Sequence, residues 1–216
     1  GSVRIAEKVG IENYNEFLQT IGIISNLEFD IQEVGTTKLG RWGKCKLATV
    51  AFGHGIATTL LQLSKGYSII SNGGYEIKPT LLKKEKLQRQ RILNENLSEK
   101  INPILRKIVS TKKGTAGFAN VKGYEIGGKT GTADQPSKGG YSKKKVNTFA
   151  SVFPTSDPKF VLSVMLDEPK ANREFVYHYR DDRYPYKGNW RNTAGWTTVW
   201  VTGQIMDKIG PILATK

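Results

Sequence analysis

Apolar residues recur at helical spacing in the first half of the chain, and the breaks between them fall at glycines. Residues 2–10 and 13–22 each close on a glycine, the residue with which helices commonly end. Residues 23–51 are mixed and predict loops. A longer helix is predicted over 58–74, where apolar side chains lie three and four apart, Thr58 can cap the start and an Asn-Gly-Gly run stops the helix.

A further helix is predicted over 96–110, the segment NLSEKINPILRKIVS. Ser98 or Asn96 can cap its start. Pro103 is then expected in the first turns, where proline is tolerated because the early amides have no partner within the helix.

The pattern changes after about residue 115, where glycine-punctuated and continuous apolar runs predict strands. Residues 125–133 predict one strand. The apolar runs 146–154 and 159–167 flank a Thr-Ser-Asp-Pro turn and predict a hairpin. An aromatic and basic stretch, 167–192, precedes a last helix at 194–209. Helices followed by a meander of strands and a final helix predict an α+β fold with an antiparallel sheet.

The net charge is strongly positive, +14 over 216 residues, which raises nucleic acid or an acidic surface as a partner. The densest basic clusters, 82–91 and 142–145, are short and mixed with polar residues, which favours a solvated face. No nucleic-acid partner is therefore expected, although a basic binding module stays open as an alternative. A basic protein also suits a substrate rich in carboxylates.

Candidate metal ligands and membrane segments are sparse in the sequence. Cys45 is the single cysteine and cannot form an internal disulfide; a buried or idle thiol is expected. His54 and His178 are far apart and have no cysteine or paired acidic neighbours, so neither a metal site nor a cofactor is predicted. No apolar run of about 18 residues is present, so no transmembrane helix is expected.

The segment GYEIGGKT, 123–130, matches the phosphate-binding loop pattern G-x-x-x-x-G-K-[ST] and makes a nucleotide-binding protein an alternative. Such a loop needs a buried strand before the first glycine and a helix starting at the Lys-Thr pair, because the helix amides hold the phosphate. The lead-in here is glycine-rich, and the tail GTADQPSKGGY contains a proline and three glycines. A helix is not expected there, so the strand interpretation is favoured.

In an extended strand, Lys129 and Gly131 point to one face and Thr130 and Thr132 to the other. Gly131 leaves room for something to come close, and Lys129 is a cation beside it. The threonines supply hydroxyl donors, and the strand's own amides and carbonyls can pair with an extended peptide. This wall suits a peptide with a free carboxylate and a reacting carbonyl.

Lys-Thr-Gly is also one motif of the serine penicillin-binding proteins and β-lactamases. Three segments in order, 48–74 with KPTLL at 78–82, then 114–134 and 147–169, resemble the transpeptidase domain of class B penicillin-binding proteins over nearly the whole chain. The likeness is strongest to the cell-division transpeptidase, chiefly in KGYEIGGKTGTA and TFASVFPTSDPKF, with the elongation enzyme second. The resemblance implies a penicillin-binding protein/serine β-lactamase-like α+β fold, incomplete at the N-terminus. Residues 1–216 are then the C-terminal portion of one domain, with a helical part at about 1–114 and the sheet and final helix at about 115–216.

The resemblance also implies that the nucleophilic serine is absent. The family's Ser-x-x-Lys and Ser-x-Asn motifs precede Lys-Thr-Gly, and the start of this chain resembles the stretch just after Ser-x-Asn. Ser110 and Ser142 each have a lysine three residues on, but the first lies just before Lys-Thr-Gly and the second after it. The chain by itself is therefore predicted inactive, whereas its parent is predicted to be a serine-type D,D-transpeptidase.

For the parent protein the resemblance implies cross-linking of peptidoglycan stem peptides through an acyl-serine, which β-lactams trap. Lys129 and Thr130 would bind the terminal carboxylate, Thr132 would give a hydroxyl contact and an oxyanion-hole amide, and Gly131 would complete the substrate wall. Implied partners are stem peptides, β-lactam antibiotics and cell-wall synthesis or divisome proteins. The implied location is the periplasmic face of the bacterial inner membrane, held by an N-terminal anchor outside this sequence.

Residues 168–192 depart from the resemblance, because they are longer and more charged than the family's usual link to the last helix. This stretch is expected to be a long loop, either over the site or on a partner surface.

Overall fold

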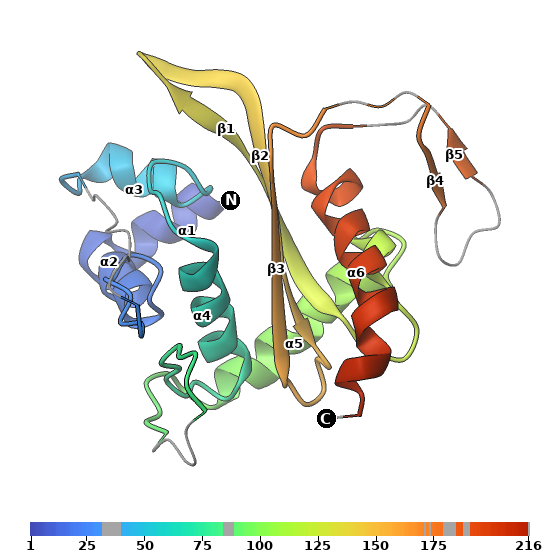
Figure 1. Cartoon of the computed structure of the whole chain (residues 1–216). Coiled ribbons are helices and arrows are strands. Elements are labelled where there is room, and N and C mark those ends of the chain that lie inside the picture. The colour runs from blue at the N-terminus through green and yellow to red at the C-terminus, as the bar shows by residue number, and fades with distance from the viewer. Residues whose placement is uncertain are drawn as a thin grey trace. The chain divides into compact units, whose positions relative to one another are not determined.

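The structure is a computed structural model that describes residues 1–31, 40–83, 89–170, 172, 174–178, 185–187 and 191–215. The chain forms two compact units, Gly1–Ser98 and Glu99–Lys216 (Figure 1). The loops predicted over residues 23–51 lie partly outside the described residues, at 32–39.

The first unit is helical, as the spacing of apolar residues predicted. Its helices up to residue 71 are α1 (Ser2–Val9), α2 (Ile11–Thr20), α3 (Lys44–Val50) and α4 (Leu60–Ser71). Gly10, with φ of 83°, separates α1 from α2, and Gly22, with φ of 82°, follows the end of α2. Both glycines adopt the left-handed region, so the predicted helix ends are confirmed. The prediction of loops throughout 23–51 was wrong at α3, a seven-residue helix whose apolar positions are too few to show a period.

Helix α4 begins with a reciprocal capping box rather than at Thr58. The Thr59 hydroxyl accepts a hydrogen bond from the Gln62 amide at 3.1 Å, and the Gln62 side chain accepts one from the Thr59 amide at 2.9 Å. Two amides without a partner inside the helix are thereby satisfied. Thr58 instead donates to the Ile23 carbonyl at 3.0 Å, so the predicted cap was wrong by one residue.

Helix α5 spans Asn96–Ser110, as predicted, but its start is organised differently. Ser98 lies within the helix, where its hydroxyl accepts from the Gly73 amide at 2.8 Å and donates to the Ile70 carbonyl at 2.6 Å. The Asn96 amide donates to the side chain of Asn94 at 2.9 Å, so neither predicted cap residue accepts at this end. Pro103 lies inside the helix and not in its first turn.

The second unit is built on a three-stranded antiparallel sheet with the order β1-β2-β3. The strands are β1 (Gly127–Ser137), β2 (Gly140–Phe153) and β3 (Phe160–Asp167). The predicted β2–β3 hairpin is confirmed, with Phe153 opposite Phe160. Among the described strands β1 is an edge strand, since β2 pairs with it on one side only.

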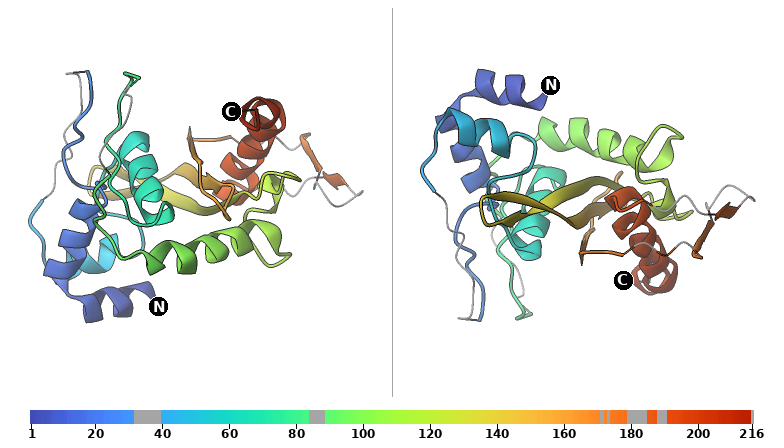
Figure 2. Two further views of the ribbon diagram at one scale, coloured as in Figure 1. Left: turned by 90° about the horizontal axis from the view of Figure 1, so that it is seen from below. Right: turned by 90° about the horizontal axis from the view of Figure 1, so that it is seen from above.

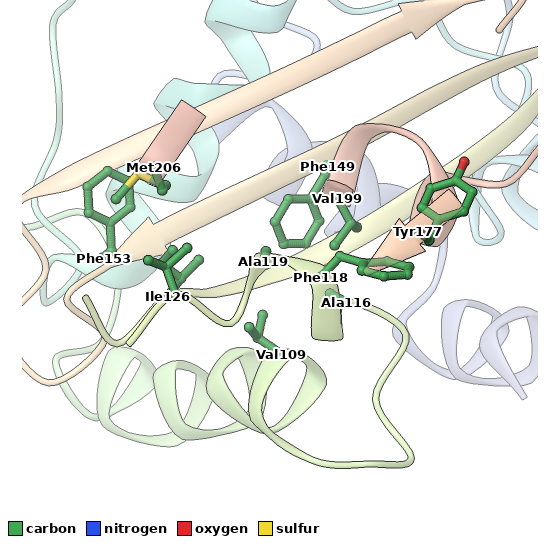
Figure 3. Packing of buried hydrophobic residues seen from close by; sticks show 11 residues of the cluster. Val109, Ala116, Phe118, Ala119, Ile126, Phe149, Phe153, Tyr177, Val199 and Met206 are labelled. Carbon is green, nitrogen blue, oxygen red and sulfur yellow. The ribbon is translucent and has the colours of Figure 1, made fainter. Parts of the chain in front are cut away.

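Two helices cover opposite faces of this sheet, as both views of Figure 2 show for α6 (Thr198–Leu213) and the part of α5 that belongs to the unit. The main apolar cluster joins the sheet to α6 and to the segment before β1; Phe149 of β2 and Val199 of α6 lie close together in it (Figure 3). Phe149 and Val199 are both fully buried. Burial of this apolar surface is the main stabilising contribution to the unit.

The last helix was predicted with wrong bounds. Residues Ala194–Trp196 form a short 3-10 helix, η2, before α6 begins at Thr198. Helix α6 continues to Leu213 through Pro211, whose ring lies in the last turn.

The expected long loop at 168–192 contains a two-stranded antiparallel ribbon. Val176–His178 (β4) pairs with Pro185–Lys187 (β5). Tyr177 of β4 is buried, and its ring centroid lies 5.3 Å from that of Phe118 and 5.1 Å from that of Trp196. This strand is therefore anchored in the core. Residues 171, 173, 179–184 and 188–190 lie outside the described residues.

Candidate active-site wall

Strand β1 carries all four predicted site residues at consecutive positions and separates them onto two faces. Thr130 and Thr132 line a cavity of about 460 Å³, whereas Lys129 and Gly131 do not. Position 127 has the same parity as Lys129, and a Cβ added there would lie 2.8 Å from the backbone nitrogen of Arg106 in α5. Lys129 and Gly131 thus point to the α5 face of the sheet, and the threonines to the α6 face.

The cavity on the α6 face is lined by hydroxyl, aromatic and cationic side chains, chiefly Thr115, Phe118, Thr130, Thr132, Arg191 and Trp196. The hydroxyl oxygens of Thr115 and Thr130 are 3.2 Å apart, and either can donate to the other. The Ala194 amide donates to the Thr132 hydroxyl at 3.0 Å. The second contact ties the site strand to the segment that leads into α6.

Lys129 is exposed, and its ammonium donates to the Thr130 carbonyl at 2.7 Å. Within the described parts of the chain it forms no ion pair with a carboxylate. A side chain reaches a strand carbonyl most readily on the side that no neighbouring strand occupies. The contact therefore indicates that Thr130 turns its carbonyl to the open edge, and since the backbone alternates with a period of two, Thr132 does the same.

Gly131 is opposite Thr148 of β2, and this neighbour explains why position 131 has no side chain. A Cβ at position 131 would lie 2.5 Å from the Thr148 hydroxyl oxygen. The sequence had explained Gly131 by the approach of a ligand alone. The cross-strand contact was not visible without the register of the sheet.

Several residues of the cavity were not among the candidates. Thr115 and Phe118 belong to the segment GTAGFAN that had supported the family resemblance, so their proximity to Lys-Thr-Gly had a signal in the sequence. Arg191 and Trp196 come from beyond residue 190 and reach the cavity through the fold alone.

The structure argues against the alternative sites that the sequence offered. Strand β1 continues from Gly127 through Ser137, so no helix begins at Lys129 and the phosphate-loop interpretation is wrong. Ser110 ends α5 and Ser142 lies on β2, and neither belongs to the described lining of the cavity. Cys45 is exposed rather than buried. The described residues contain no group of three or more His, Cys, Asp or Glu placed to hold a metal ion, and no described helix is both long and apolar enough to cross a bilayer.

The family model described as the penicillin binding protein transpeptidase domain matches residues 1–182. The chain belongs to this family. The resemblance to class B penicillin-binding proteins is thereby confirmed, together with the transpeptidase fold.

Among curated relatives of this transpeptidase domain, the probable peptidoglycan D,D-transpeptidase FtsI of Caulobacter vibrioides is 28% identical over 100% of this chain and 36% of its own length. Stage V sporulation protein D of Bacillus subtilis is 30% identical over 81% of this chain and 29% of its own length. The chain thus spans about a third of the length of these curated relatives.

Solved structures show the same fold. The transpeptidase domain of penicillin-binding protein 3 from Burkholderia pseudomallei superposes with a TM-score of 0.78 at 23% identity, over 98% of this chain and 61% of that one. Penicillin-binding protein 3 from Mycobacterium tuberculosis, in complex with aztreonam, superposes with a TM-score of 0.75 at 22% identity, over 97% of this chain and 49% of that one. The transpeptidase domain present here is therefore partial relative to these structures.

Proposed function

We propose that this chain forms the Lys-Thr-Gly wall of a serine-type peptidoglycan D,D-transpeptidase, whose nucleophilic serine is supplied by residues outside the 216 present here. The observation that carries the proposal is the position of Lys129, Thr130, Gly131 and Thr132 on an edge strand of a transpeptidase fold. An edge strand offers unpaired amides and carbonyls to an extended peptide. The donor stem peptide is the strand that would be added to β1.

In the proposed reaction the serine oxygen attacks the carbonyl carbon of the penultimate D-Ala and the terminal D-Ala leaves as a protonated amine. An amine of a neighbouring stem peptide then attacks the acyl-serine and releases the serine. The amide of Thr132, on the open edge, is one donor to the oxyanion of the tetrahedral intermediate. The exposed ammonium of Lys129, which has no carboxylate partner among the described residues, binds the terminal carboxylate of the donor peptide.

The wider setting follows from the same proposal. The FtsI likeness supports a role in cell-wall synthesis at the periplasmic face of the inner membrane, with divisome or other cell-wall synthesis proteins as partners. The aztreonam and ampicillin complexes of penicillin-binding protein 3 from Mycobacterium tuberculosis support β-lactams as inhibitors.

The test is acylation of the full-length protein by a fluorescent penicillin, with Lys129→Ala as the variant. We expect the second-order acylation rate to fall roughly 10- to 100-fold, the range for loss of a charge-assisted hydrogen bond. The melting temperature should not change, because Lys129 is exposed. Lys143→Ala is the matched control, since Lys143 is an exposed lysine on β2 outside the cavity.

Two results would speak against the proposal in different ways. Absence of labelling in the unmodified protein would remove the transpeptidase function. Equal labelling of the unmodified protein and Lys129→Ala would leave the function but remove the role of Lys129.

A further inference from the structure

The cavity on the α6 face of β1 offers hydrogen-bond donors and positive charge. Arg191 contributes a guanidinium, and no residue of the described lining is acidic. Arg191 itself is exposed, and within the described part of the chain its guanidinium has no recorded hydrogen bond or ion pair. A planar guanidinium at a cavity is suited to a carboxylate, which it can bind through two parallel hydrogen bonds.

The threonine hydroxyls have protons left to donate into this cavity. A hydroxyl carries one donor and two acceptor lone pairs. Thr132 uses one lone pair for the Ala194 amide, which leaves its O–H group to donate. Thr115 and Thr130 share one hydrogen bond, which leaves one of their two protons. These donors add to the positive charge of Arg191.

The segment that bears Arg191 is fixed to the sheet by its neighbours. The fully buried Asn147 of β2 donates from its Nδ2 to the Asn192 side chain at 3.0 Å and to the Thr197 hydroxyl at 2.9 Å. Asn147 is also the cross-strand partner of Thr132. Arg191 therefore directly precedes a residue anchored beside the Lys-Thr-Gly strand.

The two cations lie on opposite sides of the same strand. Lys129 projects to the α5 face and Arg191 lines the cavity on the α6 face. A peptide added to the open edge of β1 would present successive side chains alternately to these faces. The terminal carboxylate of such a peptide belongs to its main chain and can reach Lys129, while the side chain of the residue two positions earlier can point to the α6 face and carry a second carboxylate into the cavity.

We propose that this cavity is a specificity subsite for a carboxylate on the donor residue that precedes the two terminal D-Ala residues. The inference rests on the proposed function. It selects a stem peptide whose third residue is a diamino acid with a second carboxylate over one with lysine, since these differ by that carboxylate alone. Arg191 is the residue that binds this second carboxylate.

The experiment compares two penicillins that differ by one carboxylate, benzylpenicillin and its α-carboxy derivative. Their acylamino side chain takes the place of the donor residues before the reacting carbonyl. Acylation rates of the full-length protein are measured for the unmodified chain, Arg191→Ala, Arg191→Lys and the control Arg89→Ala, an exposed arginine outside the cavity.

For Arg191→Ala we expect the rate with the α-carboxy penicillin to fall roughly 10- to 100-fold relative to the rate with benzylpenicillin. Arg191→Lys should keep part of the preference, because it keeps the charge but not the paired geometry. Benzylpenicillin acylation also reports that each variant is folded.

An unchanged ratio of the two rates in Arg191→Ala, or the same ratio change in Arg89→Ala, would overturn the subsite while leaving the transpeptidase function intact. Failure of the unmodified protein to react with either penicillin would overturn the function and the subsite with it.

Discussion

Replacing Gly131 by alanine separates the two reasons for a glycine in the Lys-Thr-Gly strand. The new Cβ would lie 2.5 Å from the Thr148 hydroxyl oxygen, and the next nearest atom is the Thr148 Cβ at 3.9 Å. A carbon and an oxygen in contact are normally about 3.3–3.6 Å apart. A single side-chain atom is thus too close by about 1 Å, and everything else near position 131 leaves room.

The expected magnitude follows from this geometry. Forcing a methyl group into a packed site destabilises by about 1–3 kcal/mol. The loss of backbone freedom in the unfolded chain offsets about 0.4–1 kcal/mol, since Gly131 does not adopt a positive φ. Gly131→Ala should therefore lower the free energy of unfolding by about 1–2 kcal/mol.

Thr148→Ala removes the clashing atom, so the same glycine substitution should be neutral or slightly stabilising in that background. The assay is urea unfolding of the full-length protein followed by tryptophan fluorescence, for both single variants and the double variant. We expect a coupling free energy of about 1 kcal/mol or more. Gly140→Ala, where an added Cβ meets nothing within 4 Å, is the neutral control.

Additivity of the two substitutions within about 0.5 kcal/mol would refute the steric argument. Penicillin acylation of the double variant then tests the second reason. If Gly131 also keeps the strand open to the ligand, acylation stays low although stability is restored. Full recovery of acylation would show that glycine is needed at position 131 only because of the contact with Thr148.

Two further predictions concern the reaction of the isolated chain with penicillin and the dependence of the free energy of unfolding on pH. The 216-residue chain on its own should form no covalent adduct with excess penicillin, as measured by intact-protein mass spectrometry. Acylation needs an activated serine, and neither Ser110 nor Ser142 lies at the described cavity. A stoichiometric adduct on any serine of the chain would refute this prediction. Burial raises the pKa of Tyr67 from 10.0 to about 12. Its neutral form therefore contributes stability below pH 10 that is lost as the pH rises towards 12, by at most about 2–3 kcal/mol. Tyr67→Phe should flatten the urea-unfolding profile over this interval, and an unchanged slope would contradict the assignment.

The fold could be predicted largely because its regular elements leave periodic patterns. Helix α5 and the β2–β3 hairpin agree with the apolar periods and turn residues that predicted them. Helix α3 was missed because seven residues contain too few apolar positions to show a period. Strand β4 was missed because Tyr177 becomes a core residue through aromatic partners at positions 118 and 196, which no local pattern contains.

The geometry of the candidate site was predictable as far as one strand determines it, whereas the roles assigned to its residues stay predictions. Alternation along 129–132 placed the lysine and the threonines on opposite faces without knowledge of the rest of the chain. The cavity beyond the threonines depends on the segment 191–196, which is brought beside β1 by tertiary packing and not by any local pattern. Arg191 therefore had no signal in a sequence rich in scattered basic residues.

The contact between Thr132 and Ala194 changes how substitutions at position 132 should be read among relatives. The hydroxyl accepts an otherwise unpaired backbone amide at the start of η2, independently of any ligand. A hydroxyl residue at 132 is thus favoured by folding, whatever its part in the proposed reaction, because an amide without a partner is destabilising. Persistence of Thr or Ser at this position in a family alignment is therefore no measure of catalytic selection, and a natural exchange to valine would be informative only beside a compensating change in the segment that precedes α6.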